Sequence, residues 1–220
     1  MKKFILLAIL LITSRVYSDD PVVNPSDDKW RITKNSPLFS FSAEFECKRG
    51  DEVLSRVIRT GLFCPRYYYD LFDAGEEFQA RGITRAFSWG FFFPWSMEID
   101  VWDGDFYLGK IEGKFFTKSR AKFGFYDSLG IESAFAYLNT EASDFVIVAA
   151  QDEGKVLADL KGNAYGDVSV WEMNFMEALS QIDPRVLKIF AAFVADYHSQ
   201  FLPPPKEINH YYFFNNNRNN

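Results

Sequence analysis

Near its end the chain reads Asp183-Pro-Arg-Val-Leu-Lys-Ile-Phe-Ala-Ala-Phe-Val-Ala-Asp196. Asp183 is suited to cap a helix, because its carboxylate can accept from the free amides of the first turn. Pro184 is suited to the first helical position, where its missing N–H is not needed. Good or tolerable helix formers follow until Pro203 opens a run of three prolines, which a helix cannot continue through. The sequence therefore predicts a helix over residues 184–202.

This predicted helix is apolar on nearly all sides, since Lys188 is the only polar residue between Val186 and Ala195. Such a helix must be enclosed by protein or by lipid. The apolar run between Lys188 and Asp196 is much shorter than the roughly 20 residues that a membrane span needs. We therefore expect a helix enclosed by protein.

Upstream of this helix, short aromatic or apolar runs alternate with turns rich in aspartate and glycine. Aspartate hydrogen-bonds the backbone of a turn, and glycine supplies the positive φ that closes it. The 24 Phe, 11 Tyr and 5 Trp residues favour the half-buried surfaces of a sheet. We predict β-hairpins forming an antiparallel meander, with turns at Gly75, Gly104, Gly130 and Gly154.

Two of the predicted strands show the alternation of a sheet with one buried face. Ile99 and Val101 alternate with acidic residues, and Trp171, Met173 and Phe175 alternate with Glu172 and Asn174. Apolar residues at every second position are expected to point toward the core.

Three segments carry a resemblance to the tubby-like barrel superfamily, which joins the tubby C-terminal domain, the LURP-one-related proteins and the phospholipid scramblases. They are Gly109-Lys-Ile-Glu-Gly113, Phe125-Tyr-Asp-Ser-Leu-Gly130 and the predicted helix, which is similar to a scramblase pattern closing in Phe193-x-x-Asp196. The resemblance implies a mainly β fold: a closed antiparallel barrel of about twelve strands around a central hydrophobic helix. Closure removes exposed strand edges, and a helix fills a lumen too wide for side chains alone.

The first residues have the order of a secretory signal peptide. Two lysines precede the apolar stretch 4–13, and small or modest residues lead up to Ser18. We expect residues 1–18 to be removed, 19–37 to form an extended lead-in, 38–202 to form the barrel and 203–220 to form a tail rich in proline and asparagine. The protein is then exported, periplasmic or secreted, and we expect it to be bacterial.

Without residues 1–18 the chain is acidic, because this leader carries three bases and no acid. There remain 21 basic against 30 acidic residues, a formal net charge of −9. Binding to nucleic acid needs a basic footprint, so nucleic acid is not expected as a partner. About 200 residues fit one domain.

The two cysteines, Cys47 and Cys64, are in a compartment that permits a disulfide. A hairpin centred near Gly50 would instead place Cys47 opposite Val53 or Leu54. The sequence leaves both states open.

Catalytic constellations are scarce in this sequence. His198 and His210 are the only histidines, and neither belongs to a known catalytic or zinc-binding pattern. Three aspartates near Gly104 are too few for a calcium loop and are interpreted as turn residues: Asp100, Asp103 and Asp105. We expect no enzymatic activity, metal or cofactor.

The acidic segment that scramblases are thought to carry before the helix is not matched here. Asp167, Glu172 and Glu177 are scattered along that part of the chain. This departure puts calcium-triggered lipid scrambling in doubt.

A cluster of positive charge is the functional signal in this acidic chain. Residues 110–122 hold five bases and one acid, Glu112. The tubby resemblance implies a phosphoinositide-type site without locating it, and a basic row can bind phosphate oxygens of lipid headgroups. The alternative is a solvated lysine-rich face that guards against edge pairing. The candidate ligand-binding residues are Lys110, Lys114, Lys118, Arg120 and Lys122.

Three functions follow from these features. The first is an exported non-catalytic barrel that binds anionic lipid headgroups or a membrane surface through this basic row. The second is a protein-interaction module of the envelope, or a secreted effector contacting a host protein, that uses the aromatic residues 87–95. The sequence leaves open whether this segment is exposed or belongs to the core, because Phe91, Phe92 and Phe93 would cover both faces of a strand. The third is scramblase-like lipid transfer.

Overall fold

The computed structural model describes residues 29–35, 42–61, 66–86, 89–114, 121–139, 144–162, 170–176 and 181–201. These residues form twelve strands and a few helices. The predicted signal peptide and the whole of the predicted tail lie outside them.

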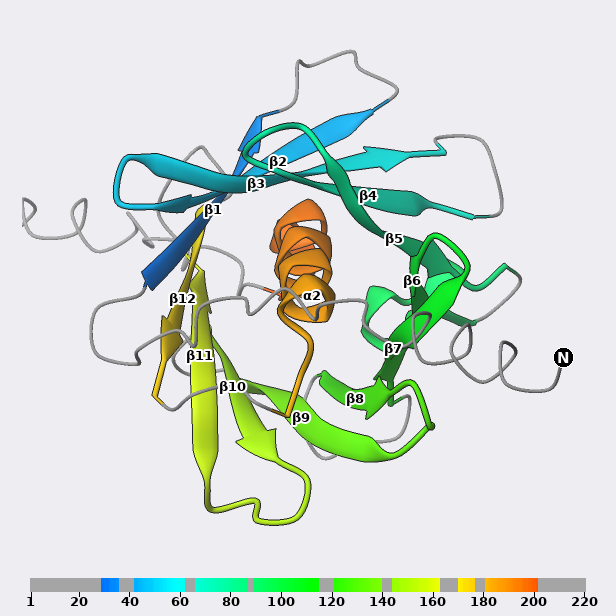
Figure 1. Cartoon of the computed structure of the whole chain (residues 1–220). Helices are drawn as coiled ribbons and strands as arrows, with labels where there is room; N and C mark the ends of the chain where they lie inside the picture. Colours follow the sequence, from blue (N-terminus) through cyan, green and yellow to red (C-terminus); the bar gives the residue numbers. More distant parts are fainter. Residues whose placement is uncertain are drawn as a thin grey trace, which may run out of the picture.

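All twelve strands form a closed antiparallel barrel in which each strand pairs with its neighbours in the chain (Figure 1). The barrel closes where β1 pairs with β12, with Trp30 opposite Met173. The predicted fold class is thereby confirmed. The strands are β1 (Lys29–Asn35), β2 (Ala43–Arg49), β3 (Glu52–Thr60), β4 (Tyr68–Asp73), β5 (Phe78–Thr84), β6 (Glu98–Asp103), β7 (Phe106–Gly113), β8 (Lys122–Asp127), β9 (Glu132–Asn139), β10 (Asp144–Ala149), β11 (Val156–Gly162) and β12 (Val170–Phe175).

The four predicted hairpins are present as β4–β5, β6–β7, β8–β9 and β10–β11. Three of their turns share one aspartate contact. Asp73 Oδ1 accepts from the amides two and four residues later, Asp127 Oδ1 does the same, and Asp152 Oδ1 accepts from Gly154. The predicted alternation is also confirmed, because Ile99, Val101 and the alternating apolar residues of β12 are buried.

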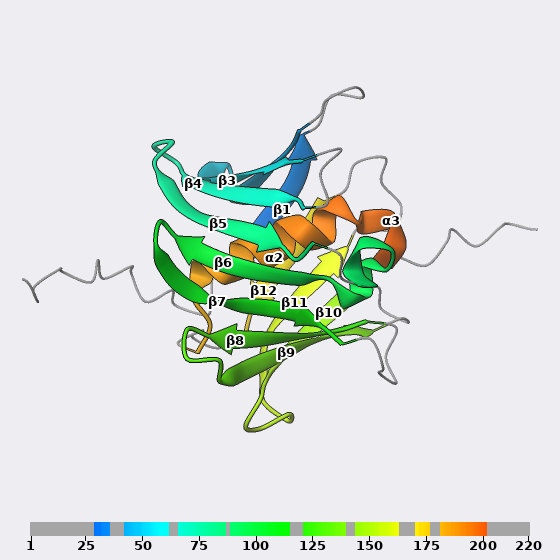
Figure 2. The ribbon, with the colours of Figure 1, turned by 90° about the vertical axis from the view of Figure 1, so that its right-hand side faces the viewer.

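A single helix, α2 (Pro184–Asp196), occupies the centre of the barrel (Figures 1 and 2). Asp183 caps it by accepting from the Arg185 amide at 2.8 Å. Every residue from Ile189 to Ala195 is buried, and aromatic side chains of the wall surround Phe190 and Phe193. Where a wall residue has no side chain, at Gly82, the helix comes close: a Cβ there would lie 2.8 Å from Ile189 Cγ2. The helix therefore fills the interior of the barrel.

The direction of α2 defines two ends of the barrel. At the turn end, where α2 begins, lie the turns of β4–β5, β6–β7 and β8–β9, at the left of Figure 2. Arg185 ties the helix to this end through ion pairs with Asp183 (2.7 Å) and with Asp103 of the β6–β7 turn (2.8 Å). At the loop end, where α2 stops, lies the short helix α3 (His198–Phe201).

Asp196 ties α2 to the wall at the loop end. Its carboxylate accepts from Lys34 Nζ at 2.9 Å and from the Tyr69 hydroxyl at 3.1 Å. Arg59 Nε lies 3.0 Å from Oδ2 in an ion pair that lacks hydrogen-bond alignment. A negative charge at a helix C-terminus opposes the helix dipole, so these two cations are needed to offset it.

Two predicted boundaries differ from the structure. The barrel begins at Lys29, inside the segment 19–37 predicted as a lead-in, because Trp30 and Ile32 alternate with polar residues and are buried against α2 and β12. The helix predicted over 184–202 is interrupted at Tyr197, so that α2 ends at Asp196 and α3 follows.

Cys47 is a free thiol buried in the wall. Cys64 itself lies outside the described residues. A bulge after Cys47 shifts the register, and Cys47 faces Ser55 instead of the predicted Val53 or Leu54. Burial raises the pKa of the Cys47 thiol to about 11, with Lys188 and Ser55 opposing the shift, so the thiol is held in its unreactive form.

We predict that Asp196→Ala destabilises the fold by about 3–5 kcal/mol, because it leaves two poorly solvated cations without their partner. Urea unfolding followed by tryptophan fluorescence measures this cost. Lys34→Met should cost less in the Asp196→Ala background than in the wild type. Strictly additive costs would show that the two residues do not interact.

His198 makes the stability of the loop end depend on pH. The buried Trp171 donates from Nε1 to His198 Nδ1 at 3.0 Å, a bond that needs this nitrogen unprotonated. Burial, together with Lys34, lowers the pKa of His198 below its ordinary value of 6.5. Just below pH 6.5, therefore, His198 binds a proton more readily in the unfolded chain than in the folded chain.

We predict that stability falls as the pH drops below 6.5 toward the lowered pKa of His198. His198→Asn should remove this part of the loss, because an amide oxygen can accept from Trp171 without titrating. Urea midpoints of both proteins on either side of pH 6.5 test the effect. Parallel pH profiles would exclude His198 as its source.

Candidate functional site

The interior of the barrel is occupied by α2 and by the inward side chains of the wall, which form one buried apolar cluster. A ligand would therefore meet the outer face or the ends of the barrel. The described helices include none that is both long and apolar enough to cross a bilayer.

The predicted basic row is only partly visible. Lys110 lies in β7, Lys114 follows β7, and Lys122 begins β8, whereas Lys118 and Arg120 lie outside the described residues. The structure brings the first two lysines together around an acid. Lys110 Nζ lies 2.6 Å from Glu112 Oε2, and Lys114 Nζ lies 3.3 Å from Glu112 Oε1.

Lys114 is held further by β8 and β9. Its ammonium donates to the Tyr126 hydroxyl and lies 3.5 Å from Glu132 Oε1. Burial alone would lower the pKa of Lys114, but Tyr126 and Glu112 outweigh it and the pKa is raised. For Glu112, burial would raise the pKa, yet Lys110 and Lys114 lower it. Both groups stay charged, and their charges largely cancel.

Lys122 is engaged by aromatic rings. Its ammonium lies 3.7 Å from the ring centroid of Phe135 and 4.6 Å from that of Tyr137, its cross-strand neighbour. Such cation–π contacts fix a cation without cancelling its charge. Among the described lysines of the row, Lys110 and Lys114 form ion pairs within the sheet. Lys122 instead contacts aromatic rings.

A second predicted feature, the aromatic segment 87–95, is partly exposed. We call residues 89–96 the aromatic loop; it contains η1 (Trp89–Phe91) and η2 (Pro94–Ser96). Trp89 is 68% exposed and Phe92 70% exposed. Trp89 stacks on Phe93, with ring centroids 6.4 Å apart, and this contact orders the loop.

The aromatic loop packs on the end of β7, next to the start of the basic segment. The Gly113 amide donates to the Met97 carbonyl at 2.8 Å. A Cβ at Gly113 would lie 2.4 Å from the Trp95 carbonyl oxygen and 2.6 Å from Ser96 Cα, so only glycine permits this approach. Lys114 is the next residue. Two segments that are separate in the sequence therefore meet at the loop end.

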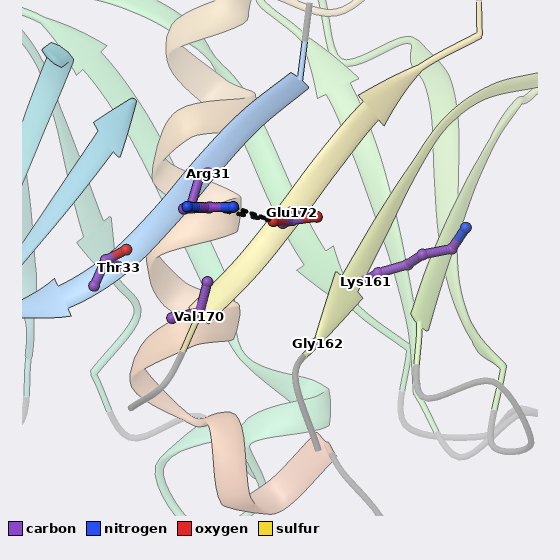
Figure 3. Close-up of a pocket in the computed structure, with 6 residues that line it drawn as sticks. All are labelled: Arg31, Thr33, Lys161, Gly162, Val170 and Glu172. Carbon is purple, nitrogen blue, oxygen red and sulfur yellow. Dashed lines mark hydrogen bonds and ion pairs between the residues drawn. The ribbon is translucent and has the colours of Figure 1, made fainter. Parts of the chain in front are cut away.

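A shallow cleft of about 520 Å³ lies on the outer wall over β1, β11 and β12 (Figure 3). Arg31 Nη2 and Glu172 Oε1 form an ion pair of 2.9 Å across it. Figure 3 shows the Lys161 side chain on the neighbouring strand, pointing away from this pair. The described lining residues are Arg31, Thr33, Lys161, Gly162, Val170 and Glu172. This cleft was not predicted from the sequence, because Arg31 and Thr33 lie in the segment 19–37 that was expected to be an extended lead-in.

Beside the cleft, two buried carboxylates belong to one polar cluster. Lys161 Nζ lies 2.9 Å from Asp159 Oδ2, and Asn174 Nδ2 donates to Asp159 Oδ1 at 2.5 Å. Asp144 is the cross-strand partner of Lys161. Burial raises the pKa of Asp144, Lys161 opposes the rise, and Asp159 adds to it. The cluster ties β10, β11 and β12 together on their outer face.

The other polar candidates have structural contacts. Asp103 forms an ion pair with Arg185, and Asp100 lies 3.6 Å from Arg85, so both carboxylates already have a basic partner within the protein. Within the described ranges, no three histidine, cysteine or acidic residues are grouped as a metal ion would require. His198 is engaged by Trp171, and His210 lies outside the described residues.

Comparison with known proteins identifies no family for this chain. No protein-family profile matches the chain, and no curated protein matches its sequence. An X-ray structure of a protein from Arabidopsis thaliana is similar over 81% of this chain and 98% of that chain, with a TM-score of 0.44 and 9% sequence identity. A likeness at this level says nothing about function.

We predict that Gly113→Ala destabilises the protein by about 1–3 kcal/mol, because the added methyl group must push the aromatic loop away from β7. Urea unfolding measures the cost, and iodide quenching should show greater exposure of Trp95. Gly75→Ala is the matched control, since a Cβ there meets only the Asp73 side chain at 3.3 Å. Equal effects of the two substitutions would contradict the close approach at Gly113.

Proposed function

We propose that this protein is an exported, non-catalytic barrel of the tubby-like kind that docks on an anionic membrane surface with its loop end. The observation that carries the proposal is the meeting of the exposed aromatic loop with the end of β7, from which the basic segment 114–122 continues. The closed barrel around an enclosed helix is the architecture that the superfamily resemblance implies, and it supports the tubby-like assignment.

The two parts of this surface suit different layers of a membrane. Tryptophan and phenylalanine favour the boundary between headgroups and acyl chains, where Trp89 and Phe92 would insert. Basic residues near the surface each contribute about 1 kcal/mol of attraction to anionic lipid. Lys118, Arg120 and Lys122 are proposed for this role. Lys110 and Lys114 are removed from it, because Glu112 and Glu132 already offset their charges.

The charge of the opposite end favours one orientation. The described turns of β4–β5, β6–β7 and β8–β9 contain acidic residues and no bases, whereas the β2–β3 and β10–β11 hairpins at the same end carry Arg49 and Lys155. An anionic surface would repel the side of this end that carries the three acidic turns, which favours contact through the loop end.

The test is co-sedimentation of residues 19–220 with vesicles of phosphatidylcholine, with or without phosphatidylserine. We predict that Lys118→Ser/Arg120→Ser/Lys122→Ser weakens binding to the anionic vesicles roughly 100-fold, from about 1 kcal/mol per charge. Trp89→Ser/Phe92→Ser should weaken it by a similar factor, because two aromatic side chains stay in water.

The control variants are Lys155→Ser and Phe106→Ser, which remove a base and an exposed aromatic residue at the turn end. Both should bind like the wild type. Equal binding by all variants, or no preference for phosphatidylserine, would rule out the loop end as a membrane surface. Loss of binding by the turn-end variants alone would reverse the orientation.

A further inference from the structure

Two neighbouring hairpins expose large apolar side chains at the turn end. Phe106 is 66% exposed at the start of β7, directly after the β6–β7 turn, and Leu129 and Ile131 are 82% and 58% exposed in the β8–β9 turn. The strands β7 and β8 are paired, with Gly109 opposite Asp127, and both turns continue beyond that pair. Both turns therefore leave the same pair of strands at the same end of the barrel. We call Phe106, Leu129 and Ile131 the turn patch.

The backbone of the patch is held rigidly. Asp127 Oδ1 accepts from the amides of both Leu129 and Ile131 at 2.9 Å. The side chains of these two residues are therefore displayed by a fixed turn. A pre-ordered apolar surface costs little entropy when it binds a partner.

The turn geometry does not require apolar residues. In the β4–β5 turn, Asp73 Oδ1 accepts in the same way from Gly75 and Glu77, also at 2.9 Å. Glycine and glutamate thus serve where the β8–β9 turn has Leu129 and Ile131. The same chain builds the same turn with and without exposed apolar side chains, so these side chains need an explanation other than folding.

The charges beside the turn patch indicate which kind of partner would bind there. Every charged residue of the two turns, 103–106 and 127–132, is acidic. Arg185 offsets Asp103, and Lys114 lies 3.5 Å from Glu132, which leaves Asp105 and Asp127 beside the apolar side chains. Apolar contact surrounded by negative charge fits a partner of opposite charge pattern.

We infer that the turn patch is a docking surface for a partner protein that presents an amphipathic segment with lysine or arginine beside leucine-like side chains. The inference does not rest on membrane docking, because the patch lies at the other end of the barrel from the aromatic loop. A barrel bound to a membrane by its loop end would present this patch away from the membrane.

The probe is a synthetic peptide of lysine and leucine in amphipathic helical order. Its companions are a scrambled peptide of the same composition and a peptide with glutamate in place of lysine. Leu129→Gly/Ile131→Glu copies the β4–β5 turn and should fold, which circular dichroism and urea unfolding verify. The matched control, Trp89→Ser/Phe92→Ser, changes exposed aromatic residues at the loop end.

Titration calorimetry at physiological salt should show that the wild type and the loop-end control bind the amphipathic basic peptide equally. The Leu129→Gly/Ile131→Glu variant should bind at least about tenfold more weakly, because anchoring apolar side chains are lost. The scrambled and the glutamate peptides should bind more weakly than the amphipathic basic one.

Equal affinity of the wild type and the turn-patch variant would overturn the inference, as would equal binding of the scrambled peptide. Self-association in the ultracentrifuge that the turn-patch variant loses would assign the surface to a second copy of this chain and overturn the assignment to a basic partner. Loss of vesicle binding in this variant would assign the surface to membrane contact and would likewise overturn the assignment to a basic partner. Since the loop-end variants test the proposed function, the two ideas can fail separately.

Discussion

The enclosure of α2 is the constraint on which the rest of this structure depends. A closed barrel of twelve strands has a lumen too wide for side chains alone, and α2 fills it. An apolar helix in turn needs walls on every side. Arg185 at the turn end and Asp196 at the loop end hold the helix in register with the wall. Because the interior is thus committed to packing, function is left to the outer face and the two ends.

The sequence predicts the parts of the fold that depend on local pattern. The helix was readable from Asp183 to Asp196, and the hairpins from their aspartate and glycine turns. The first strand was not predicted, because Trp30 and Ile32 form only a short apolar and polar alternation among prolines and polar residues. The partners of Asp196 come from three strands far away in the chain, and pairings of that kind leave no local signal.

The candidate site shows the same division between local and distant information. The sequence identified a basic row and an aromatic segment, but it could not show that they meet at Gly113. Nor could charge counting show that Lys114 is offset by Glu132, which comes from another strand. The two ends of the barrel consequently differ in character. The loop end exposes Trp89 and Phe92 near the start of the basic row, and the β6–β7 and β8–β9 turns expose apolar side chains beside acids.

The seam between β1 and β12 has a consequence for how the chain folds. It joins Lys29 to Asn174, so it is the pairing of largest sequence separation in the wall. Contacts between distant residues are slow to form because a long loop must be closed first. A polypeptide that emerges N-terminus first must keep Trp30 and Ile32 without their final neighbours until β12 and α2 are available. Completion of the wall is thereby expected to come late, and the vulnerable species is an open sheet with one unpaired edge at each side.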